Sequence, residues 1–287
     1  MNDILVRNIS YIVKGKTILE NLNFKVERNE VFALIGKNGS GKSSLIDIML
    51  QDLKPNCGEV NLFENKKCNY KNVGVLYDHL PLINTLRVEE IIKYYCTVHK
   101  LEYRSIAEKY FEDFKITQIE KSFVRTLSLG EKKRVSILLS IMHNPDLLIM
   151  DEPFANVDPT IIDQIWKILK RKNRTIFFTT HNWSDAEKRA DKVAFMGNGK
   201  LIAEPLCPSE AIKNLPAQQK LVFAYNESIE RLLNKDEYYK HNGNIVCFSQ
   251  SNSSLIGIVA QHTNNFSIQD VDLTDVYLFH LKAESNV

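Results

Sequence analysis

The sequence contains no apolar stretch long enough to cross a bilayer. Its longest strongly apolar segments, such as Val135–Met142 and Leu147–Met150, fall far short of the ~18 residues that a transmembrane helix needs. The opening residues MNDILVRNIS lack a charged segment followed by an apolar one, so we expect no secretory signal and a cytosolic chain. The chain is therefore not expected to span a membrane by itself.

An excess of charge of one sign is also missing. The chain has 37 Lys and Arg against 35 Asp and Glu. Proteins that bind nucleic acids carry a broad positive field, which this balance does not supply, so no nucleic-acid partner is expected. With 287 residues and 44% hydrophobic composition, the chain can form one large domain and a smaller second one.

Cysteine is scarce, and its spacing indicates no disulfide framework. There are five cysteines, an odd number, and no two of them form a CxxC pair, which is typical of reduced thiols. Cys96 and His99 share a face of a predicted helix and could together bind a metal. No second pair accompanies them, so we favour a structural role for both.

Apolar periodicity predicts an α/β chain. ILVRNISYIV and ILENLNFKV alternate like an antiparallel strand pair, whereas VFALI, DLLIMD, TIFFTT and VAFMG are typical of the strands of a mainly parallel sheet. Amphipathic segments between about residues 78 and 130 predict an inserted helical subdomain. Short strands and helices alternate after Pro205 and Pro208, so we expect a large unit over 1–206 and a small α+β domain over 207–287.

The strongest functional signal is GKNGSGKS, Gly36–Ser43, which fits the phosphate-binding pattern G-x-x-x-x-G-K-[ST] between a predicted strand and a predicted helix. Its glycines let successive amides face phosphate oxygens, and the helix start adds the positive end of a dipole. Lys42 would reach the β and γ phosphates, and the Ser43 hydroxyl would ligate Mg²⁺. The residues expected to contact ATP here are Gly36, Lys37, Asn38, Gly39, Ser40, Gly41, Lys42, Ser43 and Ser44.

Two acids end the apolar strand LLIMDE. Such sheets place ligands at the carboxyl ends of their strands. Asp151 would hold Mg²⁺ through water, and Glu152 would position and polarise the water that attacks the γ-phosphate. A strand that ends in acids is commonplace, and the phosphate loop is what favours a catalytic interpretation over a solvated strand end.

A third segment, LSLGEKKRVSILLSIMHNP, opens with Ser128 and Glu131 as an S-x-x-E capping box. LSLGE also resembles the signature LSGGQ of ABC ATPases. Together with the phosphate loop and the two acids, it makes the chain similar to the ATP-binding subunits of ABC transporters over nearly its whole length. The SLG form is similar to that of bacterial drug and lantibiotic exporters.

The resemblance implies a head-to-tail dimer of cassettes. Ser128 and Gly130 would bind the γ-phosphate of ATP held by the opposite subunit, as a helix N-terminus facing an anion. Leu129 replaces the first family glycine and Glu131 replaces the glutamine. Neither change removes Ser128 or Gly130, so we expect a working signature.

Two further segments resemble family motifs. PFANVDP is similar to the D-loop and implies that Asp158 takes part in communication across the dimer. Asp158 also precedes Pro159 and an apolar helix, so it can be an N-cap as well. TTHNWSDAEKRAD resembles the switch-histidine segment, which implies that His181 contacts the γ-phosphate and orients the attacking water with Glu152.

The chain departs from the family at two positions. NVGVLYDH places Asp78 where the family has Gln or Glu at the metal site, and this shorter side chain would reach Mg²⁺ less well. Val13 occupies the most direct alignment with the adenine-stacking aromatic, and Tyr11 lies two residues earlier. Tyr11 is therefore a candidate for base stacking and equally a plain strand residue.

The resemblance implies a P-loop NTPase fold of the ABC-cassette type and an ATPase that uses ATP and Mg²⁺. Its partners would be a membrane-spanning permease subunit and a second cassette, identical or paralogous, at the cytoplasmic side of the cell membrane. The tail SIQDVDLTDVYLFHL resembles that of exporters, so export is favoured. The alternatives are a soluble ABC ATPase without a membrane partner and a regulatory cassette that hardly hydrolyses ATP, and Glu152 with His181 argues against the latter.

Overall fold

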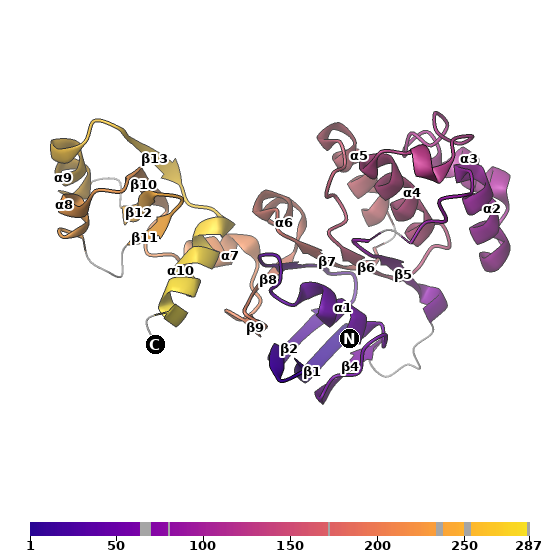
Figure 1. Ribbon diagram of the computed structural model, residues 1–287, viewed down its shortest axis with the longest axis horizontal. Coiled ribbons are helices and arrows are strands. Elements are labelled where there is room, and N and C mark those ends of the chain that lie inside the picture. Colours follow the sequence, from indigo (N-terminus) through magenta and orange to yellow (C-terminus); the bar gives the residue numbers. More distant parts are fainter. Residues whose placement is uncertain (64–69, 80, 172, 234–237, 250–253, 286–287) are drawn as a thin grey trace.

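The computed structural model describes residues 1–63, 70–79, 81–171, 173–233, 238–249 and 254–285. Two sheets lie near the middle of the molecule, a group of helices lies at one end, and a lobe formed by the C-terminal part of the chain lies at the other (Figure 1). Within the described residues, no helix is both long enough and apolar enough to span a bilayer.

A three-stranded antiparallel sheet in the order β2-β1-β4 opens the chain. It consists of β1 (Asn2–Val13), β2 (Lys16–Glu27) and β4 (Cys57–Leu62). The side chains of β2 alternate between core and solvent, because Leu22 and Phe24 are buried while the residues between and beside them are exposed. The strand pair predicted at the start of the chain is confirmed.

A six-stranded sheet in the order β5-β6-β7-β3-β8-β9 forms the centre of the molecule. All neighbouring strands pair in parallel except β9, which runs antiparallel to β8. The strands are β3 (Val31–Ile35), β5 (Val73–Leu76), β6 (Leu147–Asp151), β7 (Thr175–Thr180), β8 (Lys192–Gly197) and β9 (Lys200–Leu201).

Both faces of this central sheet are buried. In β3, Phe32 and Leu34 belong to a core shared with the antiparallel sheet and α1 (Lys42–Met49). Ala33 and Ile35 belong to a second core, to which most of the other helices contribute. Burial on both faces explains why these strands are continuous apolar runs rather than alternating ones.

The helical group is inserted between β5 and β6. It contains α2 (Val88–His99), α3 (Tyr103–Tyr110), the 3₁₀ turn η2 (Val124–Thr126) and α4 (Leu129–Ile141). Another 3₁₀ turn, η1 (Tyr70–Asn72), precedes β5; α5 (Pro159–Lys170) follows β6, and α6 (Trp183–Arg189) follows β7. The insertion that we place at about 78–130 is thus continued by α4 as far as Ile141.

The C-terminal lobe contains an antiparallel sheet in the order β11-β12-β10-β13. Its elements are α7 (Pro208–Lys213), β10 (Gln219–Ala224), α8 (Glu227–Glu230), β11 (Tyr238–His241), β12 (Asn244–Ser249), α9 (Ser254–His262), β13 (Phe266–Asp270) and α10 (Leu273–Ser285). Leu221 and Phe223 belong to a core of the lobe's own, whereas Val246 and Phe248 belong to the large core that also includes α10. The α10 helix contacts α6, α7 and β11, and it lies between the lobe and the central sheet (Figure 1).

The four cysteines in the described part of the chain, Cys57, Cys96, Cys207 and Cys247, are free thiols, and Cys68 lies outside it. Cys96 is buried in the large core. The ring of His99 stacks on that of His143, with centroids 4.3 Å apart. Among the described residues, no group of three or more His, Cys, Asp or Glu could hold a metal ion.

Candidate nucleotide-binding site

The predicted phosphate loop, Gly36–Ser43, connects the end of β3 to the start of α1. Gly39 and Gly41 have φ angles of 81° and 107°, in the left-handed region that side chains disfavour. A Cβ atom on Gly36 would lie 2.5 Å from the carbonyl oxygen of Met196, so the loop approaches β8 too closely for a larger residue. The glycines at these three positions are therefore required by the loop's shape.

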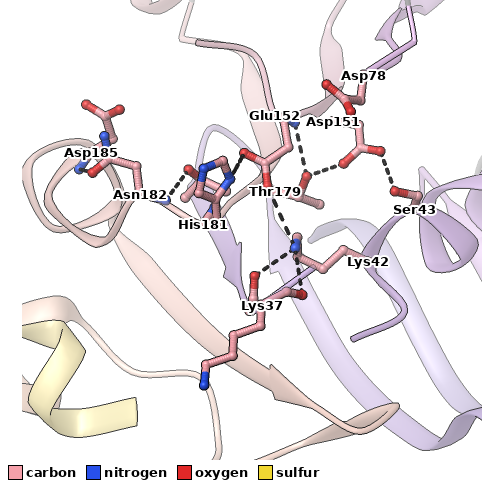
Figure 2. A network of polar contacts seen from close by, with 12 residues as sticks. Lys37, Lys42, Ser43, Asp78, Asp151, Glu152, Thr179, His181, Asn182 and Asp185 are labelled. Carbon is pink, nitrogen blue, oxygen red and sulfur yellow. Dashed lines mark hydrogen bonds and ion pairs between the residues drawn. The ribbon is translucent and has the colours of Figure 1, made fainter. Parts of the chain in front are cut away.

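Lys42 lies in the first turn of α1 with its side chain folded over the loop. Its ammonium group donates hydrogen bonds to the carbonyl oxygens of Gly36 at 2.7 Å and Lys37 at 3.3 Å. The Oε1 atom of Glu152 lies 3.7 Å from the same ammonium group. The side chain is only 6% exposed, so a buried cation faces the loop (Figure 2).

Ser43 and Asp151 meet at the carboxyl end of the central sheet. The Ser43 hydroxyl donates a hydrogen bond of 2.6 Å to Oδ2 of Asp151, and the hydroxyl of Thr179 on the next strand donates to the other carboxylate oxygen (Figure 2). These are oxygen donors in a small cluster, the ligand type that Mg²⁺ prefers. The donor set therefore fits the predicted metal site.

Glu152 is held in an unusual backbone conformation directly after β6. Its φ angle is 47°, a left-handed value that is rare outside glycine. Its amide donates to the hydroxyl of Thr179 at 3.1 Å. Because strained residues of this kind gather at functional sites, the geometry favours a role for Glu152 in the chemistry.

His181 lies immediately after β7, opposite Glu152. Its Nδ1 atom is 2.9 Å from Oε2 of Glu152, and its amide donates to the same oxygen at 3.4 Å. The Glu152 carboxylate therefore has Lys42 on one side and His181 on the other (Figure 2). A carboxylate and an imidazole in contact can accept a proton from water and orient it.

Asp78 is linked to this cluster by Lys133, a residue that the sequence analysis did not identify. Its side chain is 61% exposed, whereas that of Lys133 on α4 is only 3% exposed. The Lys133 ammonium lies 3.5 Å from Oδ1 of Asp78 and donates to the carbonyl oxygen of Asp151 at 3.4 Å. Burial lowers the pKa of Lys133, and the nearby carboxylate of Asp78 opposes that shift.

The sequence contained a signal for two residues of the site that the sequence analysis did not identify, Lys133 and Thr179. Lys133 is four positions before Ile137, so helical spacing places it on a buried face of α4. Thr179 is a polar residue inside the buried strand TIFFTT. A polar side chain in such a place needs partners, which Asp151 provides for both.

The predicted signature residues lie in a separate hollow. Ser128 caps α4, since its hydroxyl accepts from the amide of Glu131 at 3.3 Å and the Glu131 carboxylate accepts from the amide of Ser128 at 2.8 Å. Ser128, Gly130, Asn156 and Asp158 line a hollow of about 560 Å³, to which the phosphate loop does not contribute. The structure thus brings the signature and D-loop residues together, and it groups Lys42 with the two acids elsewhere.

Local contacts hold the signature residues and the D-loop residues together. A Cβ atom on Gly130 would lie 2.5 Å from the carbonyl oxygen of Asn156, so the α4 N-terminus closely approaches the D-loop segment. Asp158 caps α5 by accepting from the amide of Thr160 at 2.9 Å, as predicted, and this bond lowers its pKa. Leu129 is exposed.

Tyr11 and Ser44 complete the predicted contacts. Tyr11 is half-buried on β1, opposite Leu19, and packs partly against the core of the antiparallel sheet. Its role in base stacking stays a prediction. Ser44 follows Ser43 in the first turn of α1 and is half-buried.

Comparison with known proteins assigns the chain to a family. A family model described as ABC transporter matches residues 19–155. The lantibiotic transport ATP-binding protein SrtF of Streptococcus pyogenes is 30% identical over 205 residues, which are 69% of this chain and 89% of SrtF. The chain belongs to the ABC transporter ATP-binding proteins.

Other ABC proteins are similar over comparable lengths. YcbN of Bacillus subtilis, an ABC transporter ATP-binding protein, is 28% identical over 200 residues. These residues are 67% of this chain and 65% of YcbN, so the chain covers slightly less than two thirds of that relative. A solved structure of an ATP-binding subunit of an ABC transporter has a TM-score of 0.66 at 23% identity, over 73% of this chain and 92% of the other.

The cassette fold predicted from the sequence is therefore confirmed. ABC cassettes bind ATP and are ATPases, so the cluster around Lys42 is the candidate ATP site of this cassette. The roles of its individual residues follow as a proposal.

Proposed function

We propose that this ABC cassette hydrolyses ATP to drive a membrane exporter, as one half of a dimer bound to a permease subunit. The observation that carries the proposal is the position of the Glu152 carboxylate, 3.7 Å from the ammonium of Lys42 and 2.9 Å from Nδ1 of His181. Phosphate-binding, water-activating and phosphate-sensing groups thereby meet at one point.

ATP binds with its phosphates on the amides of the loop Gly36–Ser43 and on the ammonium of Lys42. Ser43 and Asp151 would hold Mg²⁺ beside the phosphates, where it would neutralise phosphate charge. Asp78 stays a candidate ligand at the edge of this site, and Lys133 connects it to Asp151.

Hydrolysis uses a water molecule between Glu152 and the γ-phosphate. The water oxygen forms a bond to the γ-phosphorus, the bond between that phosphorus and the bridging oxygen of ADP breaks, and Glu152 accepts the proton. His181 orients the water and contacts the γ-phosphate. The contact of His181 with Glu152 supports this division of roles.

A second cassette completes the site. Ser128 and Gly130 line a hollow to which Lys42 does not contribute, which supports a role toward a γ-phosphate presented by another subunit. The N-terminus of α4 faces that anion with the positive end of its dipole. ATP touching both halves favours the closed dimer, and hydrolysis removes this differential affinity.

Two observations support the proposed permease partner and the proposed direction of transport. SrtF is named for lantibiotic transport, and the C-terminal tail of this chain is similar to that of exporters. We therefore place the cassette at the cytoplasmic face of the cell membrane, held there by the permease. The balanced charge gives no support for a nucleic-acid partner.

The test is ATP binding and hydrolysis by the purified chain. Wild type should hydrolyse ATP in the presence of Mg²⁺, and Lys42→Ala should lose ATP affinity, because a buried cation facing the phosphates is removed. Lys54→Ala removes a lysine charge from an exposed position and is the matched control. Equal ATP affinity of Lys42→Ala and Lys54→Ala would contradict the proposal.

A further inference from the structure

Three aromatic rings from separate parts of the chain meet beside the switch histidine. The ring of Trp183, on α6, packs on that of Tyr277, on α10, with centroids 4.7 Å apart, and on that of Phe195, on β8, at 6.3 Å. Tyr277 and Phe195 are buried, and Trp183 is half-buried. The C-terminal lobe therefore holds the first residue of α6 through an aromatic contact.

The position of α6 determines where His181 lies. His181 and Asn182 form the short link between the end of β7 and Trp183. The side chain of His181 is 58% exposed, so core packing does not fix it. Asn182 caps α6 by accepting from the amide of Asp185 at 3.3 Å, which ties the link to the helix. A shift of Trp183 would therefore displace the imidazole from Glu152.

The helix that carries Tyr277 is fixed to the lobe by a buried carboxylate. Asp275 is fully buried and accepts from the ammonium of Lys220 on β10 at 2.7 Å and from the hydroxyl of Tyr239 on β11. It also accepts from the amide of Asp272 at 2.7 Å. Because Asp275 lies two residues before Tyr277, the lobe's sheet sets the position of the ring.

A hollow of about 290 Å³ shows that the lobe reaches the candidate site. Lys37 and Asn38 of the phosphate loop line it together with His181, and the lobe contributes His241, Thr274 and Tyr277. The lobe thus borders the phosphate loop and the switch histidine, far along the chain from both.

We infer that Tyr277 is a positioning residue for His181, acting through Trp183, and that the C-terminal lobe thereby sets the rate of ATP hydrolysis. This inference rests on the proposed role of His181. It gives the C-terminal lobe a role in hydrolysis that is additional to the roles of the cassette motifs.

The experiment compares kcat and KM for ATP in the full chain. Tyr277→Leu should lower kcat about tenfold or more, since small displacements of an orienting group can cost up to about a hundredfold in rate. KM should change far less than kcat, because the phosphate contacts proposed for Lys42 and the loop remain when that of His181 is lost. Tyr277→Phe keeps the ring and should retain most of kcat. Trp183→Leu should reproduce the loss from the half-buried side of the contact, where a smaller side chain disturbs the core less than at the buried Tyr277.

Two controls separate positioning from a general weakening of the lobe. Phe223→Leu removes a ring from the lobe's own core, away from α6, and should leave kcat unchanged. In a Trp166→Phe background Trp183 is the only tryptophan, so its emission reports whether the contact with residue 277 is lost.

Two results would overturn this inference and leave the proposed function intact. One is a wild-type kcat in Tyr277→Leu although Trp183 emission shows the contact is lost; the other is an equal loss in Phe223→Leu. A chain that does not hydrolyse ATP, or a fully active His181→Ala variant, would instead refute the proposed function and with it this inference.

Discussion

The hydroxyl of Ser43 lies 2.6 Å from Oδ2 of Asp151, although the two residues are 108 positions apart in the chain. Ser43 is in the first turn of α1, and Asp151 is the last residue of β6. Thr179 holds the other carboxylate oxygen. One oxygen of Asp151 is therefore kept facing the phosphate loop.

Asp151→Asn should lower the affinity for Mg²⁺, because the amide keeps the shape of the side chain but loses its charge. We expect the Mg²⁺ concentration for half-maximal hydrolysis to rise about tenfold to a hundredfold. Activity is measured against Mg²⁺ at saturating ATP, and excess EDTA should abolish it in wild type. The same Mg²⁺ dependence in both proteins would exclude Asp151 from the metal site.

Mixed dimers test whether Ser128 serves the opposite subunit. A Ser128→Arg subunit paired with a Lys42→Ala subunit keeps one intact site if completion occurs in trans, so about half of the wild-type rate should remain. A Ser128→Arg/Lys42→Ala subunit paired with wild type then has two damaged sites and should be inactive.

Both of these dimers carry the same two substitutions, so stability and expression are matched between them. Separately tagged subunits allow each mixed dimer to be purified. The reverse order of activities would show that each subunit completes its own site.

The capping box of α4 should make stability depend on pH. Burial raises the pKa of Glu131, but the hydrogen bonds from the amide and hydroxyl of Ser128 outweigh it and lower the pKa below its usual 4.5. A depressed folded pKa contributes stability that is present above about pH 4.5 and is lost as pH falls through the folded pKa. Glu131→Gln should therefore cost about 0.3–1 kcal/mol at pH 7.

Thermal unfolding of wild type and Glu131→Gln from pH 7 to pH 3 measures this difference. The gap in Tm should narrow as pH falls below 4.5. ATP hydrolysis at pH 7 should persist, because Ser128 and Gly130 are unchanged. A gap in Tm that stays constant with pH would show that the charge of Glu131 does not act on the cap.

Local patterns, together with the family resemblance that they carry, were sufficient to predict the cassette fold, and they indicated which residues would form the candidate site. The glycines before Lys42 and the acids after a buried strand are constraints that neighbouring residues impose, so they are visible in the sequence. The parallel sheet then brings the end of β6 next to the end of β7, with the end of β3 on the other side of β7.

Other features depend on contacts between distant segments. Lys133 reaches Asp151 from the inserted helical group, and Tyr277 reaches Trp183 from the C-terminal lobe. Helix and strand periodicity assigns such residues to a buried face but does not identify the partner across it. The left-handed φ of Glu152 is likewise a product of the assembled site, because nothing in LLIMDE requires it.

The most direct test of the account is the Glu152→Gln variant, because this substitution leaves the phosphate contacts proposed for Lys42 in place and removes the group proposed to accept the proton from water. We expect kcat to fall about a hundredfold or more, with ATP affinity retained. Sedimentation velocity of this variant with ATP and Mg²⁺ should show a stable dimer that disperses when the nucleotide is removed. Turnover close to that of wild type, or a monomer at saturating ATP, would contradict a cassette that closes on ATP and opens through hydrolysis at Glu152.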